Sequence, residues 1–107
     1  MKRLRFSEPL PQLILNQTKD TTWRINDKKN IVVGDRLSLC YNNESKFAQA
    51  EVIQVRETTF GDLTKEDKEG HEKFSSDKEM YETYSGYYKI DVTTKTNVKV
   101  IKFKLIK

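Results

Sequence analysis

The stretch that most constrains the fold is residues 46–56, where a long alternating pattern of apolar residues changes phase. Ala50 and Val52 share one face of an extended chain, whereas Ile53 and Val55, the next apolar residues, belong to the opposite phase. Because a slip of one residue turns every later side chain over, the pattern predicts a β-bulge or strong coiling at Val52 and Ile53. A small β-barrel requires a strand that bends in this way.

The rest of the chain alternates short strands with short helices. Apolar alternation predicts strands over residues 4–6, 21–25, 36–41, 87–92 and 98–105. Two sequences that begin with Thr64 and Ser76 have an acidic residue three positions later, as in a capping box, and predict helices that end near Gly70 and Tyr84. Together with a helix after Pro9, this order predicts an α+β fold. We expect a small mixed β-barrel of about five to six strands with two to three helices, forming a single domain over residues 1–107.

Composition excludes several classes of protein. A single cysteine, Cys40, rules out a disulfide within the chain, and its place in a predicted strand indicates a buried thiol in a reducing compartment. One histidine and one cysteine do not make a transition-metal site, and no sequence pattern indicates a cofactor. No apolar run approaches the length that spans a membrane. We therefore expect a soluble, cytoplasmic protein without a metal, a cofactor or a membrane partner.

Charge is distributed unevenly along the chain. Residues 1–29 hold seven Lys or Arg against three acids, residues 57–86 hold four against nine, and residues 87–107 hold six against one. If the two terminal strands are neighbours in the sheet, their cations form a basic surface suited to phosphate. The same pattern also fits lysines that solvate an outer face and discourage edge pairing.

The segment from Lys19 to Ile25 contains the best candidate for a site. In an extended chain, Thr22 and Arg24 share one face and Trp23 lies on the other, with Lys19 at the bend before them. A hydroxyl beside a cation, within reach of an amine, suits a polar ligand that is anionic or bears a carbonyl. The alternative is an edge strand whose Thr and Arg are solvated. Trp23 fits a core position or, in a pyrimidine pocket, a stacking platform.

The ordered set of motifs resembles the ASCH family, a small mixed barrel related to the PUA fold. The resemblance covers nearly the whole chain, and it is carried by Lys19-x-x-Thr22-x-Arg24, Val33-Gly34-Asp35, Asp62-Leu63-Thr64, Glu69-Gly70-His71 and residues 100–105. It implies a link to RNA and to modified nucleosides. One bacterial branch of the family hydrolyses the amide of 4-N-acetylcytidine.

Similarity to that branch implies the catalytic residues Lys19, Thr22 and Glu69, the glutamate being placed by its separation from Tyr84. It also implies a substrate-binding role for Arg24, with Trp23 and His71 as further candidates. The sequence departs from the branch at Trp23 and at Asp20, two changes that are expected to reshape the pocket. For His71 the alternative is a partly exposed loop residue.

These residues predict an amidohydrolase that acts on an acylated pyrimidine nucleoside such as 4-N-acetylcytidine. Partial burial and Arg24 are expected to lower the pKa of Lys19, so that its amine can act as a base on Thr22 or on a water. The alternative is an RNA-binding PUA-like module that recognises RNA or a modified base without turnover. The expected partner is thus a modified nucleoside or RNA, and not DNA.

Overall fold

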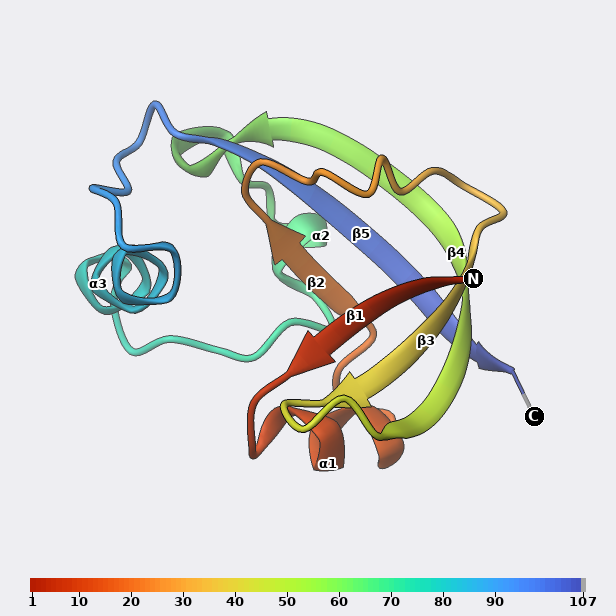
Figure 1. The fold of residues 1–107 in the computed structure, drawn as a ribbon. Coiled ribbons are helices and arrows are strands. Elements are labelled where there is room, and N and C mark those ends of the chain that lie inside the picture. Colours follow the sequence, from red (N-terminus) through yellow and green to blue (C-terminus); the bar gives the residue numbers. More distant parts are fainter. Residues whose placement is uncertain (107) are drawn as a thin grey trace.

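The computed structural model describes residues 1–106, which form one curled mixed sheet with helices at its ends and side (Figure 1). The elements are β1 (Lys2–Phe6), α1 (Leu10–Leu15), β2 (Thr21–Arg24), β3 (Arg36–Tyr41), β4 (Lys46–Thr59), a 3₁₀ turn (Phe60–Asp62), α2 (Lys65–Lys68), α3 (Asp77–Tyr88) and β5 (Asn97–Ile106). The strand order is β1-β3-β4-β5-β2, with β1 parallel to β3 and the other pairs antiparallel. The predicted α+β fold is confirmed, and the sheet curls into a half-barrel.

The predicted bulge lies in β4. Val52 pairs with Phe103 and Gln54 pairs with Lys102, so Ile53 is the extra residue between two successive partners on β5. Val52 is buried and Ile53 is 49% exposed, and the extra residue lets Val55, three positions after Val52, pack against the core again. A strand of 14 residues can therefore coil around the core while both of its ends stay paired.

The two terminal strands are not neighbours, so the basic surface that would follow from their pairing does not form. β1 is one edge of the sheet, and β5 is separated from it by β3 and β4. The two edges, β1 and β2, approach each other where the half-barrel stays open. Two cations bridge this opening: Arg24 Nη2 donates to the Arg5 carbonyl oxygen at 3.3 Å, and Lys29 Nζ donates to the Arg3 carbonyl oxygen. We call the opening between β1 and β2 the seam.

Hydrophobic side chains gather in two clusters. One fills the half-barrel and includes Ile14 of α1, Leu39, Val52 and Phe103; Cys40, a buried free thiol as predicted, lies on the same strand as Leu39. The other cluster lies under α3 and is built on Trp23 together with Phe60, Met80, Tyr84 and Val100. The second cluster fixes α3 over the end of β2, beside the seam. Among residues 1–106, no helix has the length and apolar character needed to cross a membrane.

Helix α3 is longer than predicted. Its first turn is capped by Ser76, whose hydroxyl accepts from the Glu79 N–H at 3.1 Å, but the helix continues past Gly86 to Tyr88. The predicted strand over residues 87–92 is therefore wrong. Tyr84 and Tyr88 are four positions apart and stack on one face of the helix, with ring centroids 6.4 Å apart, which favours helical over extended backbone. Lys89, in the left-handed conformation at φ 56°, ends the helix.

Candidate functional site

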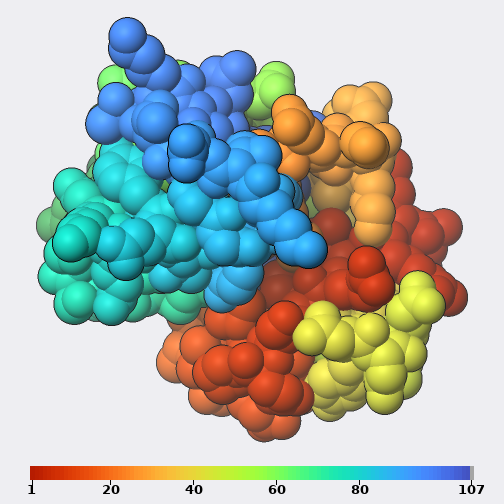
Figure 2. All heavy atoms as spheres, turned by 60° about the vertical axis from the view of Figure 1, so that its left-hand side comes forward, coloured from red at the N-terminus to blue at the C-terminus, as the bar shows by residue number. Residues whose placement is uncertain are grey.

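A pocket of about 460 Å³ lies at the seam, between the edges of the half-barrel and α3. Four cations line it, from β1, the bend before β2, the end of β2 and the loop that follows: Arg5, Lys19, Arg24 and Lys29. Five aromatic side chains form much of its wall: Phe6, Trp23, Tyr84, Tyr87 and Tyr88. Thr22 and Glu72 complete the polar lining with Ser7 and Asn42. In Figure 2 the N-terminal strand, the loop near residue 29 and the end of α3 surround a hollow on this face of the molecule.

Lys19 lies at the pocket with only 2% of its surface exposed. Its Nζ donates to Glu72 Oε1 at 2.6 Å and to the Thr21 carbonyl oxygen at 2.6 Å. Burial lowers the pKa of Lys19, as expected; Glu72 opposes this effect, and the charge of Arg24 adds to it. Burial by itself would raise the pKa of Glu72, but the charge of Lys19, the nearby His71 and the hydrogen bonds that the carboxylate accepts together outweigh burial and hold that pKa below its usual value. The two groups therefore form a coupled buried pair.

The loop after α2 brings Glu72 to Lys19. Thr64 and Asp67 form the predicted capping box, which starts α2, and the chain then turns at Gly70 with φ at +75°. The Gly70 carbonyl oxygen accepts from the Asp20 N–H at 2.8 Å and from the Thr21 N–H at 3.1 Å. These bonds fasten the loop to the start of β2, so the residues just after Gly70 lie beside Lys19.

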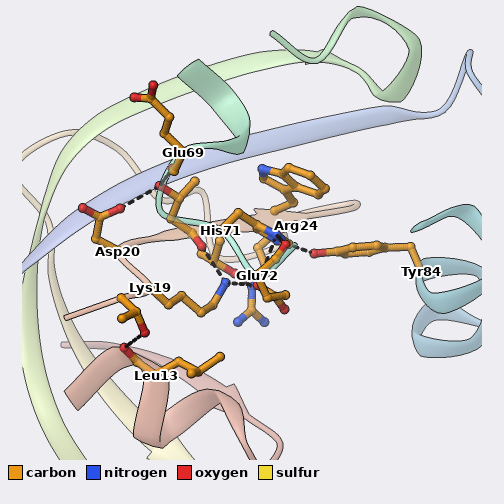
Figure 3. A network of polar contacts seen from close by, with 12 residues as sticks. Leu13, Lys19, Asp20, Arg24, Glu69, His71, Glu72 and Tyr84 are labelled. Carbon is orange, nitrogen blue, oxygen red and sulfur yellow. Dashed lines mark hydrogen bonds and ion pairs between the residues drawn. The ribbon is translucent and has the colours of Figure 1, made fainter. Parts of the chain in front are cut away.

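Glu69 is not brought to the pocket. Its side chain is exposed and points away from Lys19, and it contacts β2 through its carbonyl oxygen, which accepts from Thr21 Oγ1 at 2.9 Å (Figure 3). The carboxylate that meets Lys19 is Glu72, three residues further on. Glu69 was predicted from its separation from Tyr84 along the chain, but the length of the loop before α3 cannot be read from the sequence. A glutamate near Gly70 that could pair with Lys19 was the useful signal. The sequence has two such glutamates, Glu69 and Glu72, and does not distinguish them.

His71 is buried behind the pocket rather than lining it, and it is not an exposed loop residue either. Its ring stacks on Trp23, with centroids 3.7 Å apart, and Tyr84 Oη lies 2.8 Å from its Nε2. Its Nδ1 lies 2.8 Å from the Glu72 carbonyl oxygen and 3.1 Å from Glu72 Oε1. Burial and the nearby charge of Lys19 lower the pKa of His71 to about 4. At neutral pH the ring is uncharged, with its proton on Nδ1 facing the oxygens of Glu72.

Tyr84, His71, Glu72 and Lys19 thus form a chain of polar contacts that runs from α3 to the pocket (Figure 3). The Tyr84 hydroxyl donates to His71, His71 donates to Glu72, and Glu72 accepts from Lys19. Each member fixes the next, so the carboxylate has little freedom to leave the amine. We call this set the positioning chain.

Thr22 and Arg24 both line the pocket, as the alternation of β2 predicted. Arg24 Nε donates to Thr22 Oγ1 at 3.2 Å, and the guanidinium lies over the Phe6 ring with its Cζ 4.9 Å from the centroid. Burial lowers the pKa of Arg24. Among residues 1–106, no ion pair involves Arg24. The arginine is therefore a half-buried cation that no carboxylate pairs with among these residues.

Trp23 occupies a core position, one of the two alternatives predicted for it. It is 3% exposed and belongs to the cluster under α3, where Nε1 donates to the Asp67 carbonyl oxygen at 3.1 Å. The same residue also forms part of the pocket wall. Within residues 1–106, no group of three His, Cys, Asp or Glu side chains is placed to hold a metal ion.

Comparison with known proteins identifies the fold. No family model and no curated protein sequence matches the chain. Solved structures do match: an ASCH domain from Lactobacillus crispatus JV V101 (14% identity, 89% of this chain and 69% of the other, TM-score 0.66) and protein EF3133 from Enterococcus faecalis V583, of family DUF984 (10%, 99% and 76%, TM-score 0.75). The hypothetical protein PH0355 also matches (25%, 99% and 100%, TM-score 0.77). The chain therefore has the fold of the ASCH domain, the small PUA-like architecture that its motifs predicted.

Proposed function

We propose that this protein is an amidohydrolase that removes an acyl group from the exocyclic amine of a pyrimidine nucleoside, with 4-N-acetylcytidine as the model substrate. Lys19, Thr22 and Glu72 form the proposed catalytic set. The observation that carries the proposal is the buried amine of Lys19, which is held by Glu72 at 2.6 Å inside a pocket lined by aromatic rings. A buried lysine with a lowered pKa at such a pocket is a good candidate for a general base.

The contacts of Lys19 leave one position of its nitrogen free for chemistry. Two N–H groups donate to Glu72 Oε1 and to the Thr21 carbonyl oxygen. The remaining position holds a lone pair when the amine is neutral and a proton when it is charged. Lys19 and Thr22 both line the pocket, and in the proposed mechanism this position accepts the proton of a nucleophile there.

The proposed reaction proceeds through an acyl-enzyme. Neutral Lys19 takes the proton from the Thr22 hydroxyl, whose oxygen attacks the acyl carbonyl carbon and forms a C–O bond. The carbonyl π electrons move to the oxygen, and Arg24 stabilises the resulting negative charge. The oxyanion then re-forms the carbonyl as the C–N bond breaks, and the amine of the pyrimidine leaves with the proton that Lys19 had taken, which restores neutral Lys19. Lys19 next takes a proton from a water, whose oxygen attacks the ester carbonyl. The C–O bond to Thr22 breaks, and the Thr22 oxygen takes the proton back from Lys19 as the carboxylic acid is released.

Glu72 acts on the reaction through Lys19. Its carboxylate stabilises the ammonium that forms when the amine takes a proton, and the positioning chain keeps the carboxylate in place. The aromatic wall formed by Trp23, Tyr84, Tyr87 and Tyr88 suits the flat ring of a pyrimidine, and a pocket of about 460 Å³ is within the usual size for a small-molecule site.

Chromatography of the products tests this proposal. Purified protein is incubated with 4-N-acetylcytidine, and released cytidine is measured beside Lys19→Ala, Thr22→Val and Thr22→Ser. We expect release by the wild type, retention of measurable activity in Thr22→Ser, and a loss of about 100-fold or more in the other two variants. Full activity of Lys19→Ala in folded protein would contradict the role of the amine. Equal activity of Thr22→Val and the wild type would show that a water, not Thr22, is the nucleophile.

A further inference from the structure

Three of the four cations at the pocket have no part in the proposed transfer of a proton. Lys19 is paired with Glu72, which is also the one acidic residue among those that line the pocket. Arg5, Arg24 and Lys29 remain, and none of them takes part in an ion pair among residues 1–106. The pocket therefore carries a positive charge that no carboxylate of its own wall balances.

Two of these cations are held at the seam by bonds to β1, and the third, Arg5, is on β1 itself. Arg24 reaches across from β2 and donates to the carbonyl oxygen of Arg5, and Lys29 donates to the carbonyl oxygen of Arg3 on the same strand. Arg24 and Lys29 are thus tied to two alternate carbonyl groups of β1, and Arg5 lines the same pocket. Concentrating like charges costs free energy unless an anion neutralises them, so the arrangement favours an anionic ligand.

The other side of the pocket is aromatic and includes Tyr87, which is 57% exposed although it lies at the pocket. An aromatic wall suits a base, and a cluster of arginine and lysine suits a phosphate group. A phosphate monoester carries about −1.5 to −2 charges at pH 7, which matches the unpaired cations better than a single internal phosphodiester does. The volume of about 460 Å³ fits one nucleotide.

We propose that the substrate is a nucleotide, an acylated pyrimidine nucleoside 5′-monophosphate, and that Arg5 and Lys29 bind its phosphate at the seam while Arg24 remains with the acyl group. The acyl group of this substrate rests on the proposed amidohydrolase function, whereas the phosphate site does not depend on it. The phosphate site belongs to the products as well as to the substrate, so it can be measured without turnover.

Isothermal titration calorimetry with cytidine and with cytidine 5′-monophosphate tests the inference. We expect the monophosphate to bind at least about tenfold more tightly, because its phosphate adds charge-assisted hydrogen bonds to cations that have no carboxylate partner. Arg5→Gln and Lys29→Gln should each lower this ratio of affinities severalfold. Lys28→Gln is the matched control: it removes the same charge at the next residue, which is exposed and does not line this pocket.

Equal affinities for the two ligands, or a control that lowers the ratio as much as Lys29→Gln does, would overturn the inference. A cytidine-containing oligonucleotide that binds more tightly than the monophosphate, with a steep dependence on salt, would overturn it in favour of RNA. Tight binding of the monophosphate without hydrolysis of acylated cytidine would refute the proposed function and leave the phosphate site standing. Hydrolysis of acylated cytidine without any preference for the monophosphate would support the proposed function and refute the phosphate site.

Discussion

Replacing Glu72 with Gln is predicted to destabilise the protein in a way that depends on pH. The change removes the negative charge beside Lys19, which is 2% exposed, while keeping the shape of the side chain and a hydrogen-bond acceptor. Lys19 must then remain buried as an unpaired cation or lose its proton. Losing the proton from an amine with an unfolded pKa of about 10.4 costs about 4.6 kcal/mol at pH 7, at about 1.36 kcal/mol for each pH unit.

This value is the upper limit for the destabilisation caused by the unpaired charge, because Lys19 of the folded protein can become neutral instead of remaining charged. Two features make the expected destabilisation smaller. The Thr21 carbonyl oxygen still accepts from Lys19, and the side chain of Glu72 is 18% exposed, so water screens part of the pair. Removing one partner of a buried pair typically costs about 3–5 kcal/mol. We therefore expect Glu72→Gln to lower the free energy of unfolding by about 2–4 kcal/mol at pH 7.

The sign of the pH dependence follows from proton binding. In Glu72→Gln the pKa of Lys19 falls further below that of the unfolded chain, so between the two values the unfolded state binds more protons and stability rises with pH. The deficit in unfolding free energy relative to the wild type should thus shrink between pH 7 and pH 10.

Urea unfolding can be followed by the fluorescence of Trp23, the one tryptophan, which stacks on His71. Glu69→Gln, the same change at an exposed site, should have no measurable effect. A deficit below about 1 kcal/mol at pH 7, or one that is the same at both pH values, would refute the reasoning.

Three further predictions concern neighbouring residues. The ring protons of His71, the one histidine, should titrate by NMR with a pKa of about 4. Because this pKa is lowered from 6.5, the wild type should lose about 3 kcal/mol of stability as the pH falls from 6.5 to 4. The variant His71→Gln should lose less stability over the same pH range. Gly70→Ala should lower the free energy of unfolding by at least about 1 kcal/mol in a denaturant titration, since φ is +75° and the added Cβ would lie 1.8 Å from Asp20 Oδ1; an unchanged midpoint would contradict this. Arg24→Lys should keep the fold but lower kcat/KM by about 100-fold, because a lysine cannot bridge Thr22 and the Arg5 carbonyl at once; activity close to the wild type would argue against an arginine-stabilised oxyanion.

The sequence predicted those parts of the fold that depend on local pattern. The change of phase at Val52 and Ile53 predicted the bulge in β4, and Thr64 with Asp67 predicted the start of α2. It failed at the end of α3. Tyr87 and Tyr88 fit a strand as well as a helix by residue type, and only packing against the cluster under α3 decides for the helix.

The site shows the same division. Alternation along β2 correctly placed Thr22 and Arg24 together, since that relation involves neighbours on one strand. The choice between Glu69 and Glu72 depends on how the Gly70 loop docks on β2, which is a contact between segments about 50 residues apart. The seam was equally hidden from the sequence, because it requires the order of strands in the sheet, which also refuted pairing of the terminal strands.

The most direct test of the central claim compares the two glutamates in the hydrolysis of 4-N-acetylcytidine. kcat/KM is measured for the wild type, Glu72→Gln and Glu69→Gln, each shown to be folded at the assay temperature. We predict that Glu72→Gln lowers kcat/KM by about 100-fold to 10,000-fold, the usual contribution of a proton-transfer system, and that Glu69→Gln stays close to the wild type. The reverse order, or a folded wild type that releases no cytidine, would contradict the assignment of Lys19 and Glu72 as the catalytic pair.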